Sequence, residues 1–184
     1  MKEKQQIKHS DYILTIKEFW SPSQCEDFIA KSEALGYEQA KVQTESGEKL
    51  VEAVRNNQRV LFKDRELAAE LWLQVKPFVL SKLGNSIAIG LNEMFRFYKY
   101  QAGEEFKKHR DQSFIRNESE SSYFTFIIYL NEGFLGGETE FKEVKIIPKT
   151  GDALLFFHDL EHSGNPIEEG AKYLLRTDVM YRLE

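Results

Sequence analysis

The chain has 184 residues, 41% of them hydrophobic, and a formal net charge of −5. This length is typical of one domain with a sizeable core, and the acidic balance argues against a nucleic-acid partner. The single cysteine excludes an intrachain disulfide framework and a cysteine-rich zinc site. The opening MKEKQQIKHS is unlike a signal peptide, and the longest apolar runs are too short to span a bilayer. We therefore expect one cytoplasmic domain over residues 1–184 without a membrane partner.

The N-terminal half predicts one strand and two helices. We expect residues 1–10 to be frayed and DYILTIKEFW to form a strand. In SPSQCEDFIAKSEALGY, Ser21 opens a capping box, Pro22 suits the first helical position and Gly36 is a natural stop. Cys25 falls on the apolar stripe of this helix and is predicted to be a core residue.

A second helix is predicted after the short strand signal in RNNQRVLF. Asp64 is its expected cap, and Leu67, Leu71 and Val75 form an apolar stripe at helical spacing. Pro77 is expected to kink or end it, because proline lacks the backbone N–H that a helix interior requires. The segment KVQTESGEKL between the two helices is polar and typical of turns.

From Asn92 onward the pattern changes to short aromatic and β-branched runs, namely EMFRFYKY, YFTFIIYL, TEFKEV, DALLFFH and KYLLRTDVMYR. Helices followed by strands predict an α+β domain built on a β-sandwich or jelly roll. We place the helical support at about residues 20–85 and the jelly-roll core at about 90–184. The polar loops QSFIRNESESS and NEGFLGGE are candidate lids over one end.

The stretch FKKHRDQSF places His109 and Asp111 two residues apart, so an extended segment would aim both at one point. Two histidines and one carboxylate form the facial triad that holds non-haem Fe(II). His158 and His162 compete for the third position. Lys172, on one strand face with Leu174 and Arg176, supplies a cation for the far carboxylate of a keto-acid cosubstrate.

The C-terminal half resembles the 2-oxoglutarate/Fe(II) dioxygenases, in particular their prolyl 4-hydroxylase branch. The resemblance rests on YQAGEEFKKHRD, YLNEGFLGGETEF and GDALLFFHDLEHSGNPIEEGAKYLLRTDVMYR. In order, these give a tyrosine, a glycine, an aromatic residue, H-x-D, a distal histidine and a basic residue ten positions later. The match runs over roughly Glu93–Arg182. It implies a double-stranded β-helix flanked by N-terminal helices.

The resemblance also assigns residues. It implies that His109, Asp111 and His162 bind iron, and it favours His162 over His158 because His158 would spoil the spacing to the basic residue. The residues it assigns to 2-oxoglutarate binding are Tyr100, Tyr129, Thr139, Lys172 and Arg176. Three roles for Arg176 stay open: it assists Lys172, positions the iron-bound ligand, or contacts substrate.

The implied activity is Fe(II)-, O₂- and 2-oxoglutarate-dependent hydroxylation of a prolyl residue, a free amino acid or another small molecule, releasing succinate and CO₂. Asp111 favours hydroxylation, since halogenating relatives lack the carboxylate ligand. Ascorbate is the reductant that the family uses to rescue oxidised iron. The alternative function is a cupin-like β-sandwich that binds a metal or small acid without turnover.

Several residues have simpler interpretations. Tyr98 is either a core aromatic or a substrate contact. Arg55 and Asn57 belong to a polar cluster that we interpret as a loop with ordinary hydrogen bonds, with substrate contact as the alternative. Lys172 follows two glutamates and could be solvent-exposed.

Overall fold

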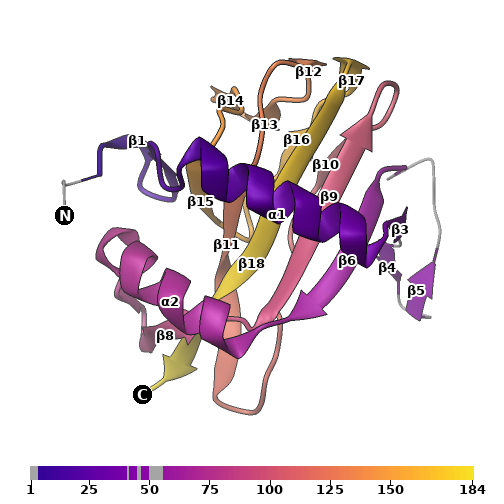
Figure 1. The fold of residues 1–184 in the computed structure, drawn as a ribbon. Coiled ribbons are helices and arrows are strands. Elements are labelled where there is room, and N and C mark those ends of the chain that lie inside the picture. The colour runs from indigo at the N-terminus through magenta and orange to yellow at the C-terminus, as the bar shows by residue number, and fades with distance from the viewer. Residues whose placement is uncertain (1–3, 41, 45–46, 50–55) are drawn as a thin grey trace.

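The longest strand, β18 (Ala171–Leu183), lies in the middle of the main sheet (Figure 1). The computed structural model describes residues 4–40, 42–44, 47–49 and 56–184. Within these, ten antiparallel strands form the main sheet. Its order is β1 (Gln6–Ser10), β2 (Ile13–Ile16), β15 (Ala153–Phe157), β11 (Glu120–Tyr129), β18, β9 (Met94–Gln101), β6 (Gln58–Lys63) and β3 (Glu38–Gln39), with β8 (Ser86–Leu91) beside the end of β18 and β7 (Lys82–Leu83) beside β8.

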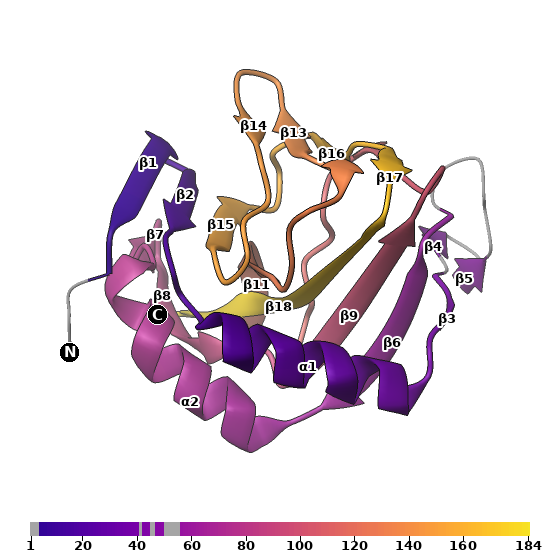
Figure 2. The same ribbon diagram turned by 45° about the horizontal axis from the view of Figure 1, so that its top comes forward.

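A smaller sheet covers one face of the main sheet (Figure 2). Its strands lie in the order β10 (Phe106–His109), β16 (His162–Gly164), β13 (Thr139–Phe141) and β14 (Lys145–Ile146). The pairs β12 (Leu135–Gly136) with β17 (Ile167–Glu169) and β4 (Val42–Thr44) with β5 (Gly47–Lys49) stand apart from both sheets. A buried cluster that includes Tyr98, Tyr129, Phe141 and Phe156 fills the space between the two sheets.

Two helices, α1 (Pro22–Leu35) and α2 (Arg65–Val75), cover the opposite face of the main sheet, and the 3₁₀ turn η1 (Lys76–Phe78) follows α2 (Figure 2). The strands separate two cores because side chains alternate across a sheet. Phe95 and Phe97 of β9 pack with the helices, whereas Tyr98 and Tyr100 point to the smaller sheet. The polar side chains that β9 and β18 contribute to the candidate site, namely Arg96, Lys172 and Arg176, share this second face.

The predicted helix signals are confirmed. Ser21 and Gln24 form both hydrogen bonds of the capping box, and the backbone N–H of Gly36 closes the last turn. Asp64 caps α2 by accepting from the N–H of Leu67 at 2.9 Å. Cys25 is fully buried in the helix-side core.

Two expectations about the N-terminal half need correction. Residues 6–10 are not frayed, because they form β1 and pair with β2 as a hairpin. The boundary between helical support and strand core is also less sharp than predicted, because β2 and β6 lie inside the main sheet next to β15 and β9. The polar composition of residues 6–10 does not indicate an edge strand, because the outward side chains of such a strand face water whether or not its backbone is paired.

Gly151 permits a close backbone contact with the entry to α1. Its φ is +80°, and an added Cβ would lie 2.1 Å from the carbonyl oxygen of Trp20. We expect Gly151→Ala to lower the free energy of unfolding by about 1–3 kcal/mol or more, from the backbone conformation and the clash. Urea unfolding measures it, with Gly90→Ala as control because no atom lies within 4 Å of a Cβ there. Equal stability of the two variants would contradict this.

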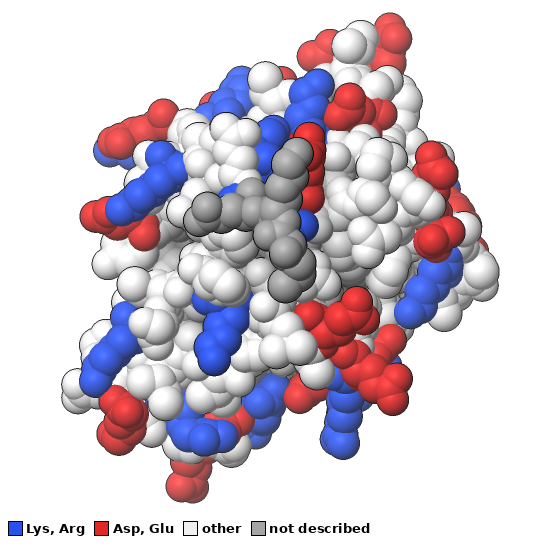
Figure 3. Space-filling model, turned by 60° about the vertical axis from the view of Figure 1, so that its left-hand side comes forward, with Lys and Arg blue, Asp and Glu red and all other residues white. Residues whose placement is uncertain are grey.

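No helix within the described ranges is long and apolar enough to cross a membrane. On the face drawn in Figure 3, Lys and Arg side chains are interspersed with Asp and Glu side chains.

Candidate metal and cosubstrate site

His109, Asp111 and His162 come together at one end of the smaller sheet. His109 ends β10, Asp111 lies two residues further on, and His162 begins β16. The register of β10 against β16 pairs His109 directly with His162. One candidate ligand atom from each of the three residues lies within 4.8 Å of the other two. Strand pairing therefore joins two sequence segments about fifty residues apart into one cluster.

The hydrogen bonds of both imidazoles leave the same nitrogen open. Nδ1 of His109 donates to the carbonyl oxygen of Lys107 at 2.8 Å, and Nδ1 of His162 donates to that of Leu160 at 2.9 Å. A neutral ring bonded in this way carries its lone pair on Nε2. The two Nε2 atoms lie 3.5 and 3.8 Å from the carboxylate oxygens of Asp111. Burial lowers the pKa of His162 to about 4, so its ring is neutral at pH 7.

This donor set fits a divalent cation. Nε2 of His109 is buried and has no hydrogen-bond partner among the described residues. Two nitrogen lone pairs that face a carboxylate repel it unless a positive charge lies between them. Two imidazoles and one carboxylate are also the ligand set that binds non-haem Fe(II).

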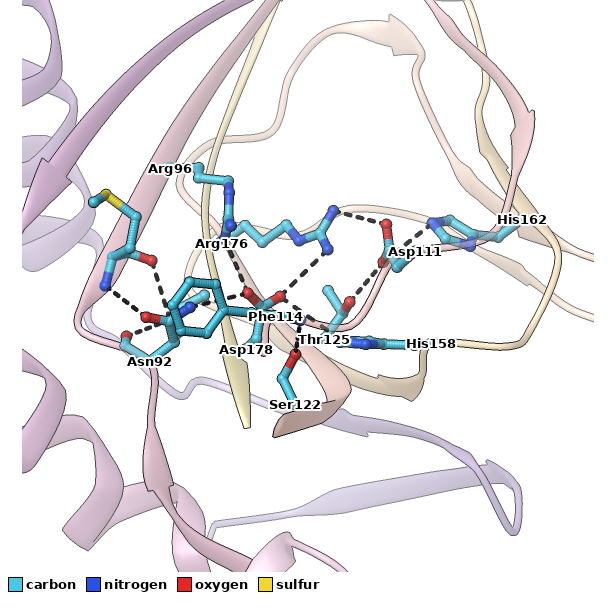
Figure 4. A network of polar contacts seen from close by, with 12 residues as sticks. Asn92, Arg96, Asp111, Phe114, Ser122, Thr125, His158, His162, Arg176 and Asp178 are labelled. Atoms are coloured by element: carbon cyan, nitrogen blue, oxygen red, sulfur yellow. Dashed lines mark hydrogen bonds and ion pairs between the residues drawn. The ribbon is translucent and has the colours of Figure 1, made fainter. Parts of the chain in front are cut away.

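Asp111 is fixed at both oxygens. Arg176 donates from Nη1 to Oδ1 at 2.8 Å, and Thr125 donates from its hydroxyl to Oδ2 at 2.6 Å (Figure 4). Burial alone would raise the pKa of Asp111, but the guanidinium of Arg176 holds it well below its ordinary value. The carboxylate is therefore ionised and oriented at neutral pH.

Lys172 lies at the other end of the same cavity, and its exposed fraction is only 2%. Its ammonium donates to the carbonyl oxygen of Gly137 and lies 5.3 and 5.6 Å from the ring centres of Tyr100 and Tyr129. The Tyr129 hydroxyl bonds that of Thr139 at 2.7 Å. Burial lowers the pKa of Lys172 to about 7, although Glu138 opposes the shift.

The cavity between these two ends holds about 400 Å³ when its part open to solvent is included. Its lining includes alternate residues of β18, namely Lys172, Leu174 and Arg176, as their spacing predicted. Phe106 stacks on His109 with ring centres 3.5 Å apart and closes one side. The cavity has a cation at one end, a cluster of imidazoles and a carboxylate at the other, and apolar walls between them. This arrangement suits a short dicarboxylate.

The remaining candidate residues differ in their position relative to the cavity. Tyr98 and Tyr100 are buried and line the cavity. Asn57 is fully buried and is not among the lining residues, so a direct substrate contact by its side chain is not supported. Arg55 lies outside the described residues. Lys172 is not the solvent-exposed lysine of the simpler interpretation.

His158 lies outside the cluster. Its ring is buried, neither ring nitrogen has a hydrogen-bond partner among the described residues, and Nε2 lies 3.7 Å from an oxygen of Asp178. Its carbonyl oxygen accepts from the backbone N–H of Asp111 at 3.1 Å. His158 therefore supports the segment that carries Asp111.

Residues 95–177 match the model of the 2OG-Fe(II) oxygenase superfamily. This segment is a 2OG-Fe(II) oxygenase domain. The match confirms the enzyme class expected from the sequence, an Fe(II)- and 2-oxoglutarate-dependent dioxygenase that consumes O₂. The search among curated proteins found no match.

Solved structures share the fold of the oxygenase domain and its flanking helices. A viral collagen prolyl hydroxylase from Paramecium Bursaria Chlorella virus-1 is 20% identical, with a TM-score of 0.67 over 95% of this chain and 98% of that one. A Pseudomonas putida prolyl-4-hydroxylase is 16% identical, with a TM-score of 0.66 over 95% of this chain and 94% of that one. A Trichoplax adhaerens prolyl hydroxylase was solved with a hypoxia inducible factor peptide fragment. It is 18% identical, with a TM-score of 0.72 over 92% of this chain and 84% of that one. These likenesses confirm the predicted double-stranded β-helix.

Proposed function

We propose that His109, Asp111 and His162 bind Fe(II), that Lys172 anchors 2-oxoglutarate, and that the enzyme hydroxylates a prolyl residue or free amino acid. The observation that carries the proposal is the convergence of two open imidazole nitrogens and one ionised carboxylate at the end of a cavity whose other end holds a buried lysine. Iron held by these residues would supply the oxidative decarboxylation of 2-oxoglutarate. One oxygen atom of O₂ would enter succinate, CO₂ would be released, and the other oxygen atom would become the hydroxyl group of the product.

The side chains around the cavity divide the remaining work. The ammonium of Lys172 pairs with the far carboxylate of the cosubstrate, and Tyr100 orients that carboxylate from the neighbouring strand β9. Thr139 lines the cavity, and its hydroxyl is hydrogen-bonded to that of Tyr129, whose ring faces the lysine. Phe106 and the buried apolar walls exclude water, which strengthens the ion pair.

A prolyl substrate is favoured by the fold likeness over more than nine-tenths of the chain to three prolyl hydroxylases, one of them solved with a peptide fragment. We also assign Tyr98 to substrate contact, and its position in the cavity lining supports this role. Cytoplasmic location and the use of ascorbate to rescue oxidised iron complete the proposal.

Anaerobic addition of Fe(II) and 2-oxoglutarate to metal-free protein tests the site. We expect a weak visible metal-to-ligand charge-transfer band, and succinate after air is admitted. Well-folded protein that never develops the band would refute the proposed ligand set. A band without any succinate would favour the cupin-like binding protein instead.

The pKa of Lys172 predicts how 2-oxoglutarate affinity depends on pH. Below about pH 7 the ammonium is already charged, so affinity should be constant. Above it, binding must take up a proton, and Kd should rise by up to about tenfold per pH unit. Titrations between pH 6 and 9 measure this. Lys172→Arg should flatten the profile, because arginine stays charged throughout. A flat wild-type profile would contradict the prediction.

A further inference from the structure

Arg176 is bound to two carboxylates and not to the lysine end of the cavity. One guanidinium nitrogen donates to Asp111 at 2.8 Å, and the other donates to Asp178 at 3.3 Å (Figure 4). Both acids are buried, with side-chain exposures of 4% and 2%. The guanidinium plane is therefore held at both ends by charge-assisted hydrogen bonds, which restrict its rotation.

Asp178 is itself fixed from behind. Its second oxygen accepts from Arg96 at 3.0 Å, and its backbone oxygen accepts from the N–H of Asn92 at 2.8 Å. Arg96 and Arg176 are direct partners across β9 and β18, so the pairing of the two strands sets their separation. Asp111, Arg176, Asp178 and Arg96 form a chain of alternating charge with no net charge, which is a condition for burying ions.

Lys172 has different surroundings on the same strand face. Within the described part of the chain it forms no ion pair, and its ammonium faces two tyrosine rings and one carbonyl oxygen. A cation without a carboxylate partner is available to an incoming anion, whereas Arg176 has both ends of its guanidinium occupied. The two cations of β18 therefore suit different tasks.

We infer that Arg176 is a positioning residue for the metal-binding carboxylate, supported by Asp178, and not a second anchor for the cosubstrate. With Thr125 on the other oxygen, it holds Asp111 in one orientation before a metal arrives. The inference rests on the proposed ligand set. Partners behind a metal ligand typically change metal affinity by roughly ten- to a hundredfold when they are removed.

The test separates metal affinity from cosubstrate affinity. Arg176→Gln should weaken the binding of Co(II) or anaerobic Fe(II) alone by roughly ten- to a hundredfold, while Kd for 2-oxoglutarate on metal-saturated protein changes by less than about twofold. Asp178→Asn should give the same pattern more weakly. Lys172→Met should give the opposite pattern, with metal affinity kept and 2-oxoglutarate affinity lost.

Three controls keep the result interpretable. Arg182→Gln removes an arginine from the same strand whose partner, Glu120, lies away from the site, and should leave both affinities unchanged. Arg176→Lys keeps the charge and one donor, so it should recover part of the metal affinity if Arg176→Gln folds poorly. Circular dichroism and Tm establish folding in every case.

The outcomes separate this inference from the proposed function. Wild-type protein that binds no metal refutes the proposed function. Wild-type binding combined with an Arg176→Gln variant that keeps full metal affinity overturns the inference alone. So does an Arg176→Gln variant that loses only 2-oxoglutarate affinity, because Arg176 would then be an anchor.

Discussion

His162→Ala should abolish Fe(II)-dependent succinate formation, with a loss larger than roughly a hundredfold, the upper end of what removing a mere supporting partner costs. The substitution removes one of three converging ligand atoms and leaves two, His109 Nε2 and an oxygen of Asp111. His109→Ala should have the same effect. The fold should survive, because each imidazole bonds only a carbonyl oxygen two residues away.

His158→Ala is the informative comparison, since His158 was the competing third ligand in the sequence. It should keep metal binding and succinate formation, at some loss of stability from the cavity that it leaves. The measurement is anaerobic metal titration followed by a succinate assay for each variant. Loss of metal binding in His158→Ala with retention in His162→Ala would exchange the two assignments.

Local sequence signals predicted the helices well. The caps at Ser21 and Asp64 depend on atoms three residues apart, so the sequence alone contains all the partners. The alternation of Lys172, Leu174 and Arg176 was also local, and these residues do line one cavity. Extending that alternation by one more step would have reached Asp178, which shares their face.

The support behind the ligand set could not be predicted in the same way. Arg96 reaches Asp178, and Thr125 and Arg176 converge on Asp111, because β9 and β11 flank β18 in one particular register. A shift of one residue would turn each side chain to the helix-covered face. Sequence patterning predicts which side chains of one strand share a face. It does not predict which side chains of the neighbouring strands they will contact.

The burial of Lys172 is the feature with the largest consequence for cosubstrate binding. Its ammonium is surrounded by aromatic rings and one carbonyl oxygen, and burial lowers its pKa to about 7. The folded protein therefore holds a poorly solvated cation that becomes fully compensated only when an anion enters. Such a site sacrifices some stability for affinity.

Lys172→Met should therefore weaken the binding of 2-oxoglutarate and stabilise the fold. Kd for 2-oxoglutarate should rise by roughly ten- to a hundredfold, because a charge-assisted bond worth about 1.5–3 kcal/mol is lost. The free energy of unfolding of the metal-free protein should increase by about 1–2 kcal/mol, because an apolar chain of similar length replaces a desolvated cation. Isothermal titration and urea unfolding at pH 7 measure the two effects.

Lys142→Met is the matched control, because Lys142 is exposed in the loop after β13 and should change neither quantity. Retained 2-oxoglutarate affinity in Lys172→Met would mean that the far carboxylate binds elsewhere. A parallel loss of affinity and stability would mean that the lysine is needed for packing. Only a loss of affinity with a gain in stability fits a buried cation held ready for an anionic cosubstrate.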